Sequence, residues 1–234
     1  MLCVTDCRLP RACRDELLRL GIEPILLPPH PSLSAPIASH ADLLLFSIGK
    51  TVLTHKSYAT IAERELSRIS ECGYEIRLCD TVIGESYPND VSLCACATKN
   101  HLICNTRHTA ADAVSLAKQA GLSIVDVSQG YAKCSCAALS DGAVISADAG
   151  ICKAFSAQGG EALLISSGHV KLPPYQYGFI GGASGLCGDT LYFAGSIERH
   201  PDYEKIRDFC ARHKTPIRSL SDEVLFDVGS MIFL

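Results

Sequence analysis

Residues 89–128 read NDVSLCACATKNHLICNTRHTAADAVSLAKQAGLSIVDVS, and this stretch decides the fold. Short runs rich in apolar residues flank one segment in which apolar residues recur at helical spacing. The predicted elements are a strand from Asn89, a turn at Lys99-Asn100, a strand over His101–Thr106, a helix over Thr109–Ala120 and a strand over Ser123–Ser128. The stretch is therefore predicted to form one ββαβ unit.

The same order of elements recurs four more times along the chain, which is typical of a repeat architecture. Asp-Gly between two apolar runs, as at Asp141-Gly142, is the strongest short hairpin signal. Another expected hairpin turn is Gly49-Lys50 in unit two, and unit five is expected to begin in the glycine-rich loop 178–189. The other expected helices are Pro10–Leu20, Lys56–Glu71, Ile151–Ala157 and Pro201–His213. The chain is thus predicted to contain five units.

The first unit lacks its opening strand. Leu2–Asp6 is predicted to be a strand that leads directly to a helix, whereas residues 222–234, DEVLFDVGSMIFL, read as a strand with no helix after it. Pairing of the two chain ends would complete unit one and remove exposed sheet edges. We therefore predict one α/β domain over residues 1–234, a five-fold pseudosymmetric α/β propeller of ββαβ units closed by the C-terminal strand.

Composition excludes several classes of protein. Hydrophobic residues make up 47% of the chain and charged residues 20%, which is typical of a globular protein with a sizeable core. The net charge of -4 and the scattered Lys and Arg residues argue against a nucleic-acid partner. The N-terminus, MLCVTDCRLPR, has no signal-peptide pattern and no apolar run reaches membrane-spanning length, so a cytoplasmic protein with no membrane partner is expected.

The 13 cysteines lie mostly within apolar strand patterns. In a reducing compartment such residues are expected to be free thiols that pack as small hydrophobic side chains. Cys-x-Cys occurs at Cys94/Cys96 and at Cys134/Cys136, and strand alternation would place each pair on one face, where a soft metal site is conceivable. Buried packing is the preferred interpretation because the usual Cys-x-x-Cys spacing is absent, so no metal or other cofactor is predicted.

Aligning the units by their hairpin turns identifies equivalent positions. The inner strands are expected to begin near His40 in unit two, Asp90 in unit three and Lys133 in unit four. In a ring of such units the inner strands start around the central axis. These three residues are therefore expected to face one shared space.

Five ββαβ units, the first of them split between the chain ends, resemble the pentein fold of the guanidino-group-modifying enzymes. This family includes dimethylarginine dimethylaminohydrolase, arginine deiminase, agmatine deiminase and amidinotransferases. Pro88-Asn89-Asp90-Val91-Ser92 is similar to the segment in which an acidic pair grips the guanidinium, with Asn89 in place of a second carboxylate or an arginine. Ser167-Gly168-His169-Val170-Lys171 is similar to the segment of the catalytic histidine. The chain also looks like an uncharacterised bacterial group of this fold that carries GYAKCSC, SSGHVKLP and GFIGGASG segments.

The resemblance fails at the nucleophile. The family places a cysteine near the C-terminus, but no cysteine follows Cys210, and Ser230 is the nearest hydroxyl, with no base assigned to it by the sequence. Lys133 also replaces an acid of the hydrolases. A relocated nucleophile, Cys134 paired with His169, is one possibility, and Lys133 could activate its thiol. Adjacent strand residues point to opposite faces, however, which argues against that activation.

Three functions stay open at this point. The main prediction is an axial pocket in which Asp90, Asn89, Lys133 and His169, helped by His40, bind a small polar molecule of guanidino or ureido type. The alternatives are an amidinohydrolase or deiminase that uses Cys134 with His169, and a non-catalytic interaction module, since the same fold serves a ribosome-binding translation factor. Each residue also has a structural interpretation: Asp90 as a turn acid, His169 as a loop histidine, and His40 with Asp42 as a structural pair.

Overall fold

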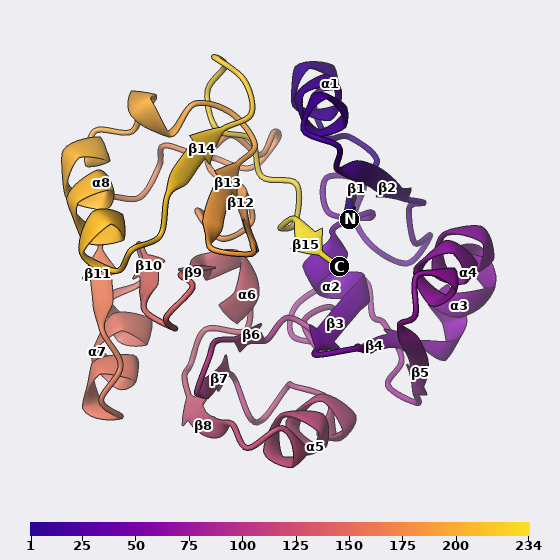
Figure 1. Cartoon of the computed structure of the whole chain (residues 1–234). Helices are drawn as coiled ribbons and strands as arrows, with labels where there is room; N and C mark the ends of the chain where they lie inside the picture. The colour runs from indigo at the N-terminus through magenta and orange to yellow at the C-terminus, as the bar shows by residue number, and fades with distance from the viewer.

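The computed structural model describes residues 1–234 and contains five three-stranded sheets. Figure 1 shows the sheets following one another in chain order around the centre of the molecule, with the longer helices outside. The strands are β1 Leu2–Asp6, β2 Glu23–Leu27, β3 Leu45–Ile48, β4 Thr51–His55, β5 Glu75–Cys79, β6 Cys96–Ala97, β7 His101–Cys104, β8 Ser123–Asp126, β9 Cys136–Ala138, β10 Val144–Ser146, β11 Ala162–Leu164, β12 Ser184–Cys187, β13 Thr190–Phe193, β14 Ile217–Ser219 and β15 Ile232–Phe233. In every sheet the middle strand pairs antiparallel with the inner strand and parallel with the outer one, as a ββαβ unit requires.

The two chain ends form one sheet, as predicted. Strand β15 pairs antiparallel with β1, in the register Cys3 opposite Phe233 and Val4 opposite Ile232. The segment that leads into β15 also contacts unit five, because the backbone N–H of Met231 donates to the carbonyl of Ser184 at 3.0 Å. The C-terminal segment therefore joins the first unit to the last one (Figure 1).

The five predicted helices are present, one of them divided in two, and three short helical turns were not predicted. They are α1 Arg11–Arg19, α2 Ala41–Leu44, α3 Lys56–Ile61, α4 Glu63–Glu71, α5 Ala111–Gln119, α6 Ala132–Ser135, α7 Ala149–Ala157 and α8 Tyr203–Arg212, with a 3-10 turn, η1, at Ile197–Arg199. The single helix predicted over Lys56–Glu71 is two helices, because the backbone of Ala62 departs from helical geometry (φ -104°, ψ 28°). Gly21 and Gly121, at φ +73° and +79°, end α1 and α5 in the left-handed conformation that glycine adopts without strain.

The inner strands begin later than predicted. Helical turns α2 and α6 precede β3 and β9, and Asp90 lies in a turn ahead of β6. The prediction that strands begin near His40, Asp90 and Lys133 is therefore wrong. Each helical turn forms a hydrogen bond within its own backbone. The N–H of Leu44 donates to the carbonyl of His40 at 3.2 Å, and the N–H of Ser135 donates to the carbonyl of Tyr131 at 2.9 Å.

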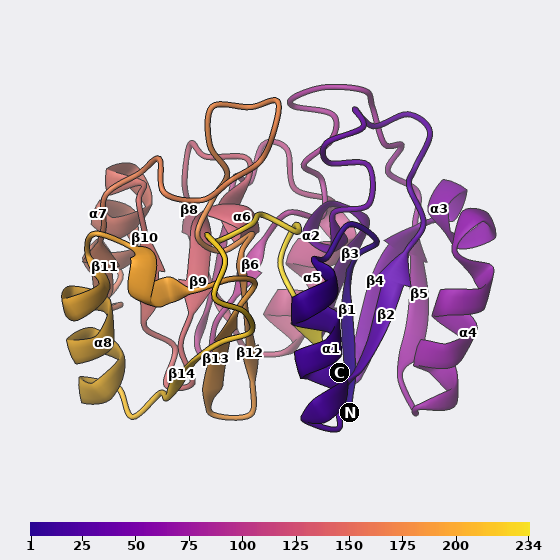
Figure 2. The same ribbon diagram turned by 90° about the horizontal axis from the view of Figure 1, so that it is seen from above.

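The core lies between each sheet and its outer helix. In unit one, for example, Cys13 and Leu17 of α1 are fully buried and belong to the same apolar cluster as Cys3 of β1. All 13 cysteines are free, and most of them are buried. None of the helices has the length and apolar character needed to cross a membrane. Figure 2 shows long loops extending beyond the sheets on one side of the molecule and the two termini on the other side.

Candidate functional site

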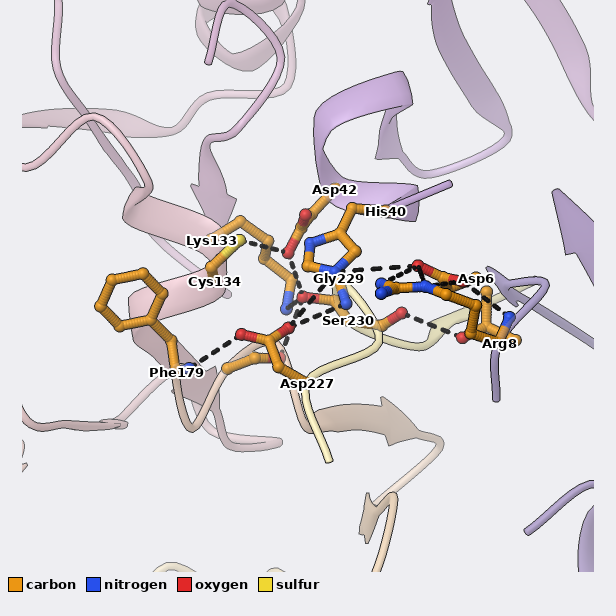
Figure 3. Close-up of polar contacts among 12 residues, drawn as sticks. Asp6, Arg8, His40, Asp42, Lys133, Cys134, Phe179, Asp227, Gly229 and Ser230 are labelled. Carbon is orange, nitrogen blue, oxygen red and sulfur yellow. Dashed lines mark hydrogen bonds and ion pairs between the residues drawn. The ribbon is translucent and has the colours of Figure 1, made fainter. Parts of the chain in front are cut away.

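Asp42 is buried and belongs to a hydrogen-bond cluster (Figure 3). Its Oδ2 atom accepts a hydrogen bond from the Cys134 thiol at 2.9 Å and one from the Ser230 hydroxyl at 2.7 Å. The ammonium of Lys133 donates to Ser230 Oγ at 3.2 Å. Burial raises the pKa of the Asp42 carboxyl, while Cys134, Ser230 and Lys133 act in the opposite direction.

The helical turn α6 explains how Lys133 and Cys134 reach the same cluster. On a strand, neighbouring side chains would point to opposite faces, but on a helical turn they project about 100° apart. Lys133 therefore contacts Ser230 while Cys134 contacts Asp42. Burial, the hydrogen bond with Cys94 and the charge of Asp42 raise the pKa of the Cys134 thiol well above its ordinary value, so the thiol is protonated in the free protein.

Ser230 joins the same cluster from the C-terminal segment of the chain. Its backbone is left-handed (φ +68°), it is fully buried, and its hydroxyl lies 2.9 Å from the carbonyl of Gly181. The sequence placed no base near Ser230, whereas the structure brings both Asp42 and Lys133 to its hydroxyl.

A second buried group surrounds His40. Its Nε2 atom lies 3.7 Å from Asp6 Oδ2 and 3.9 Å from Asp227 Oδ1. Burial, reinforced by the charge of Arg8, lowers the pKa of His40 to about 3, so the imidazole is neutral. Burial and the Asp42 carboxylate raise the pKa of Asp227 to about 7, although Asp227 accepts backbone hydrogen bonds from Phe179 and Gly229.

These groups border a cavity of about 370 Å³, which we call the axial cavity. It is lined by Ile37, His40, Tyr131, Cys134, Leu172, Tyr175, Gln176, Tyr177, Phe179 and Asp227. Four of these side chains are aromatic, and the rings of Tyr131 and Phe179 are stacked with centroids 6.2 Å apart. Asp90 does not line the cavity but supports its wall, because its buried carboxylate accepts a hydrogen bond from the Tyr131 hydroxyl at 2.6 Å.

The structure places the other predicted residues around different spaces. Lys133 lines a second hollow, of about 180 Å³, together with Asp42, Met231 and Phe233. His169 is exposed and lines a third, of about 190 Å³, beside Gln129, Ser135, Asp148 and His200. Asn89 is exposed in the loop before β6.

Of the predicted residues, His40 and Cys134 thus meet in the axial cavity, and Asp90 reaches it through Tyr131. His169 and Cys134, the predicted base and nucleophile, line different hollows that share Tyr177 and Phe179 as wall residues.

Sequence reasoning did not select Asp227, Asp6 or Tyr131 as site residues. Asp227 stands in the C-terminal DVGS segment, in which a buried acid before glycine could have been a signal. Asp6 is the last residue of strand β1, and Tyr131 directly precedes the helical turn α6. Neither position can be recognised as a site residue before the fold is known. One combination can hold a metal ion: potential ligand atoms of His40, Asp42 and Cys134 all lie within 4.8 Å of one another.

Solved structures with the same arrangement of elements belong to pentein-fold enzymes. Dimethylarginine dimethylaminohydrolase from Pseudomonas aeruginosa, a cysteine-to-serine variant complexed with citrulline, has a TM-score of 0.55 and 12% identity over 94% of this chain and 92% of that chain. Agmatine deiminase from C. jejuni has a TM-score of 0.54 and 8% identity over 94% and 76% of the two chains. An amidinotransferase of the saxitoxin pathway from Microseira wollei has a TM-score of 0.51 and 9% identity over 97% and 93%. The chain therefore has the pentein fold that its repeats predicted.

Sequence comparison gives a more specific assignment. No curated protein matches the sequence. The profile of one family matches almost the whole chain, over residues 4–232. By this match the chain belongs to DUF6873, a family of unknown function.

Proposed function

We propose that this protein binds a small molecule with a planar cationic group, of the guanidino or amidino type, in the axial cavity. The observation that carries the proposal is the composition of the cavity wall, which combines stacked aromatic rings with the buried carboxyl of Asp227 and contains no Lys or Arg. Its volume of about 370 Å³ suits a small molecule.

Both kinds of wall residue favour a cation. Aromatic faces attract cations through their electron-rich centres, most strongly where water is excluded. A planar guanidinium can stack on a ring such as that of Tyr131 or Phe179 while its edge donates hydrogen bonds to a carboxylate such as Asp227. His40 does not oppose this binding, because burial holds its pKa at about 3 and its imidazole neutral.

The position of Lys133 supports the same preference. An ammonium in the cavity wall would favour neutral or anionic ligands. Lys133 instead donates to Ser230 and lines the second hollow with Asp42. The charge offered to a ligand in the axial cavity is therefore that of Asp227.

The fold relatives point to the same class of compound. They are named for dimethylarginine, agmatine and amidino-group transfer, and one was solved with citrulline. A shared fold supports a guanidino-related function without specifying the ligand.

Cys134 gives a second candidate function, a thiol-dependent reaction on the bound group. It lines the same cavity, and its thiol already donates to Asp42 Oδ2 at 2.9 Å, which makes that carboxylate the proton acceptor in such a reaction. The raised pKa of the thiol means that attack requires ionisation after the ligand has bound, for which a cation beside the sulfur would be the driving force. Release of ammonia or an amine that is lost in Cys134→Ser would support this reaction.

Calorimetric titration with agmatine, arginine and methylarginines, with neutral citrulline for comparison, tests the binding proposal. Because the pKa of Asp227 is raised to about 7, cation binding should strengthen between about pH 6 and about pH 8 as the carboxyl ionises. Asp227→Asn should weaken binding at least about ten-fold and remove its pH dependence, since it deletes the charge. Asp126→Asn, at an exposed acid of β8, is the matched control and should bind as the wild type does.

Two outcomes would refute the proposal. One is the absence of binding by any cationic compound, which would favour an interaction module. The other is equal binding of citrulline and arginine by both the wild type and Asp227→Asn, which would show that cationic charge is not recognised.

A further inference from the structure

Two short helical turns bring three potential metal ligands together: His40, Asp42 and Cys134. Asp42 belongs to α2, His40 immediately precedes it, and Cys134 belongs to α6. Each of the three is at most 2% exposed, and one potential ligand atom from each lies within 4.8 Å of the others. We propose that these three side chains bind a divalent transition-metal ion of the zinc type. This site shares His40 and Cys134 with the wall of the axial cavity, but its ligand is a metal ion and not the organic cation proposed above.

The donor set fits that class of ion. One thiolate, one imidazole and one carboxylate are the ligand types that Zn²⁺ takes in proteins. Mg²⁺ and Ca²⁺ prefer oxygen donors only, so sulfur and nitrogen here disfavour them. A neutral imidazole with two anionic ligands also balances the two positive charges of the ion, which makes a buried complex electrically neutral.

One unpartnered polar atom gives independent support. Asp42 Oδ1 is buried and has no hydrogen-bond partner, although buried polar atoms are nearly always paired. The other oxygen of Asp42, Oδ2, already accepts from Cys134 and Ser230, so Oδ1 is left with free lone pairs beside the cluster.

The surroundings of His40 include two carboxylates near one of its ring nitrogens. Histidines that bind a metal usually present the second ring nitrogen to a carboxylate, which fixes the ring orientation. Figure 3 shows the imidazole of His40 with Asp42, Asp6 and Asp227 around it. Nε2 is the atom near the latter two, at 3.7 and 3.9 Å, which leaves Nδ1 as the ligand atom.

Three protein ligands leave one position of a tetrahedral ion open. His40 and Cys134 both line the axial cavity, so this position would face the cavity and the ion could enter through it. Binding replaces the hydrogen bond from the Cys134 thiol to Asp42 with a sulfur–metal bond, and the thiol proton leaves for solvent. Lys133 contacts Ser230 and therefore does not occupy Asp42 Oδ1.

Cobalt titration of the folded protein tests the site directly, because a thiolate bound to Co²⁺ gives a charge-transfer absorption that other ligands do not. The exposed thiols Cys7 and Cys72 are first removed by Cys7→Ser and Cys72→Ser to suppress surface binding. Cys134→Ser keeps a hydroxyl donor to Asp42 and deletes the thiolate. Cys104→Ser, at a buried thiol of β7 outside the cluster, is the matched control.

The expected result is a saturable charge-transfer band at a single equivalent of Co²⁺, displaced by Zn²⁺, with release of the thiol proton. Cys134→Ser should lose the band and bind Zn²⁺ at least about ten-fold more weakly, whereas Cys104→Ser should match the parent. If Cys134→Ser does not fold, as judged by circular dichroism, His40→Gln provides the second test and should weaken binding to the same degree.

Absence of the band, its persistence in Cys134→Ser, or its equal loss in Cys104→Ser would overturn the proposal. No organic ligand enters these titrations, and the calorimetry with cationic compounds can be run in the presence of a chelator. Failure of the metal site and failure of the cation site are therefore separate results.

Discussion

The buried pair His40 and Asp227 predicts how folding stability depends on pH. Burial lowers the pKa of His40 to about 3 and raises the pKa of Asp227 to about 7. Near pH 5 the folded pair therefore holds one proton, whichever of the two side chains carries it. The unfolded pair also holds one proton, on a histidine with a pKa of 6.5, while the aspartate with a pKa of 3.8 is ionised. Between about pH 4.5 and about pH 6 the pair should therefore not change the free energy of unfolding of the wild type with pH.

Asp227→Asn should reveal how His40 alone contributes to the pH dependence of folding stability. A histidine whose pKa is depressed on folding stabilises the protein above its unfolded pKa, and this stability is lost as the pH falls below 6.5. The slope is about 1.4 kcal/mol per pH unit, so the variant should lose about 2 kcal/mol relative to wild type between about pH 6.5 and about pH 5. His40→Gln should show the opposite sign. The raised pKa of Asp227 gives stability that is full below pH 3.8 and lost as the pH rises to about 7.

Urea unfolding followed by circular dichroism at a series of pH values measures these slopes. All other titrating groups are common to the wild type and the variants, so the difference in slope isolates the pair. The absolute stability of Asp227→Asn also reflects its changed hydrogen bonds to Phe179 and Gly229, and only the slope is tested. Equal slopes for the wild type and both variants would refute the reasoning, as would a change in Asp126→Asn as large as that in Asp227→Asn.

Three further predictions concern packing and can be measured by urea unfolding at one pH. Gly182→Ala should destabilise the fold by about 2–4 kcal/mol, because its Cβ would lie 2.0 Å from Asp227 Oδ1, and wild-type stability would contradict that packing. Deletion of residues 232–234 should cost at least about 2 kcal/mol, since it removes β15 and its hydrogen bonds to β1, and an unchanged midpoint would argue against the pairing of the chain ends. Tyr131→Phe should cost about 1–3 kcal/mol by leaving the buried Asp90 carboxylate without its donor, whereas Tyr131→Phe made in an Asp90→Asn background should cost less.

The fold could be predicted because its signals are local and repeated. The turns at Gly49-Lys50 and Asp141-Gly142 fix hairpins with few other options, and the strand β15 without a helix could pair only with the unit that lacked a strand. The positions of α2 and α6 could not be predicted, because a segment of only four residues is too short for its periodicity to distinguish a strand from a helical turn.

The candidate site was predicted only in part for the same reason. His40 and Cys134 were selected through their places in the repeat, and both line the axial cavity. Asp227 comes from the far end of the chain, and its contacts with His40 and Phe179 depend on side-chain packing that unit alignment does not describe. His169 was selected through its motif, but the loop after β11 carries it into the neighbouring hollow.

The hydroxyl of Ser230 and the thiol of Cys134 converge on one oxygen of Asp42, yet only Cys134 lines the axial cavity. Ser230 contacts Gly181 and Lys133 on the buried side, so its hydroxyl helps to hold the Asp42 carboxyl in place. Any ligand in the axial cavity therefore meets Cys134, His40 and Asp227 as its reactive side chains. Because burial keeps the thiol protonated, a positive charge must enter before Cys134 can ionise, and both the proposed organic cation and the proposed metal ion would supply that charge.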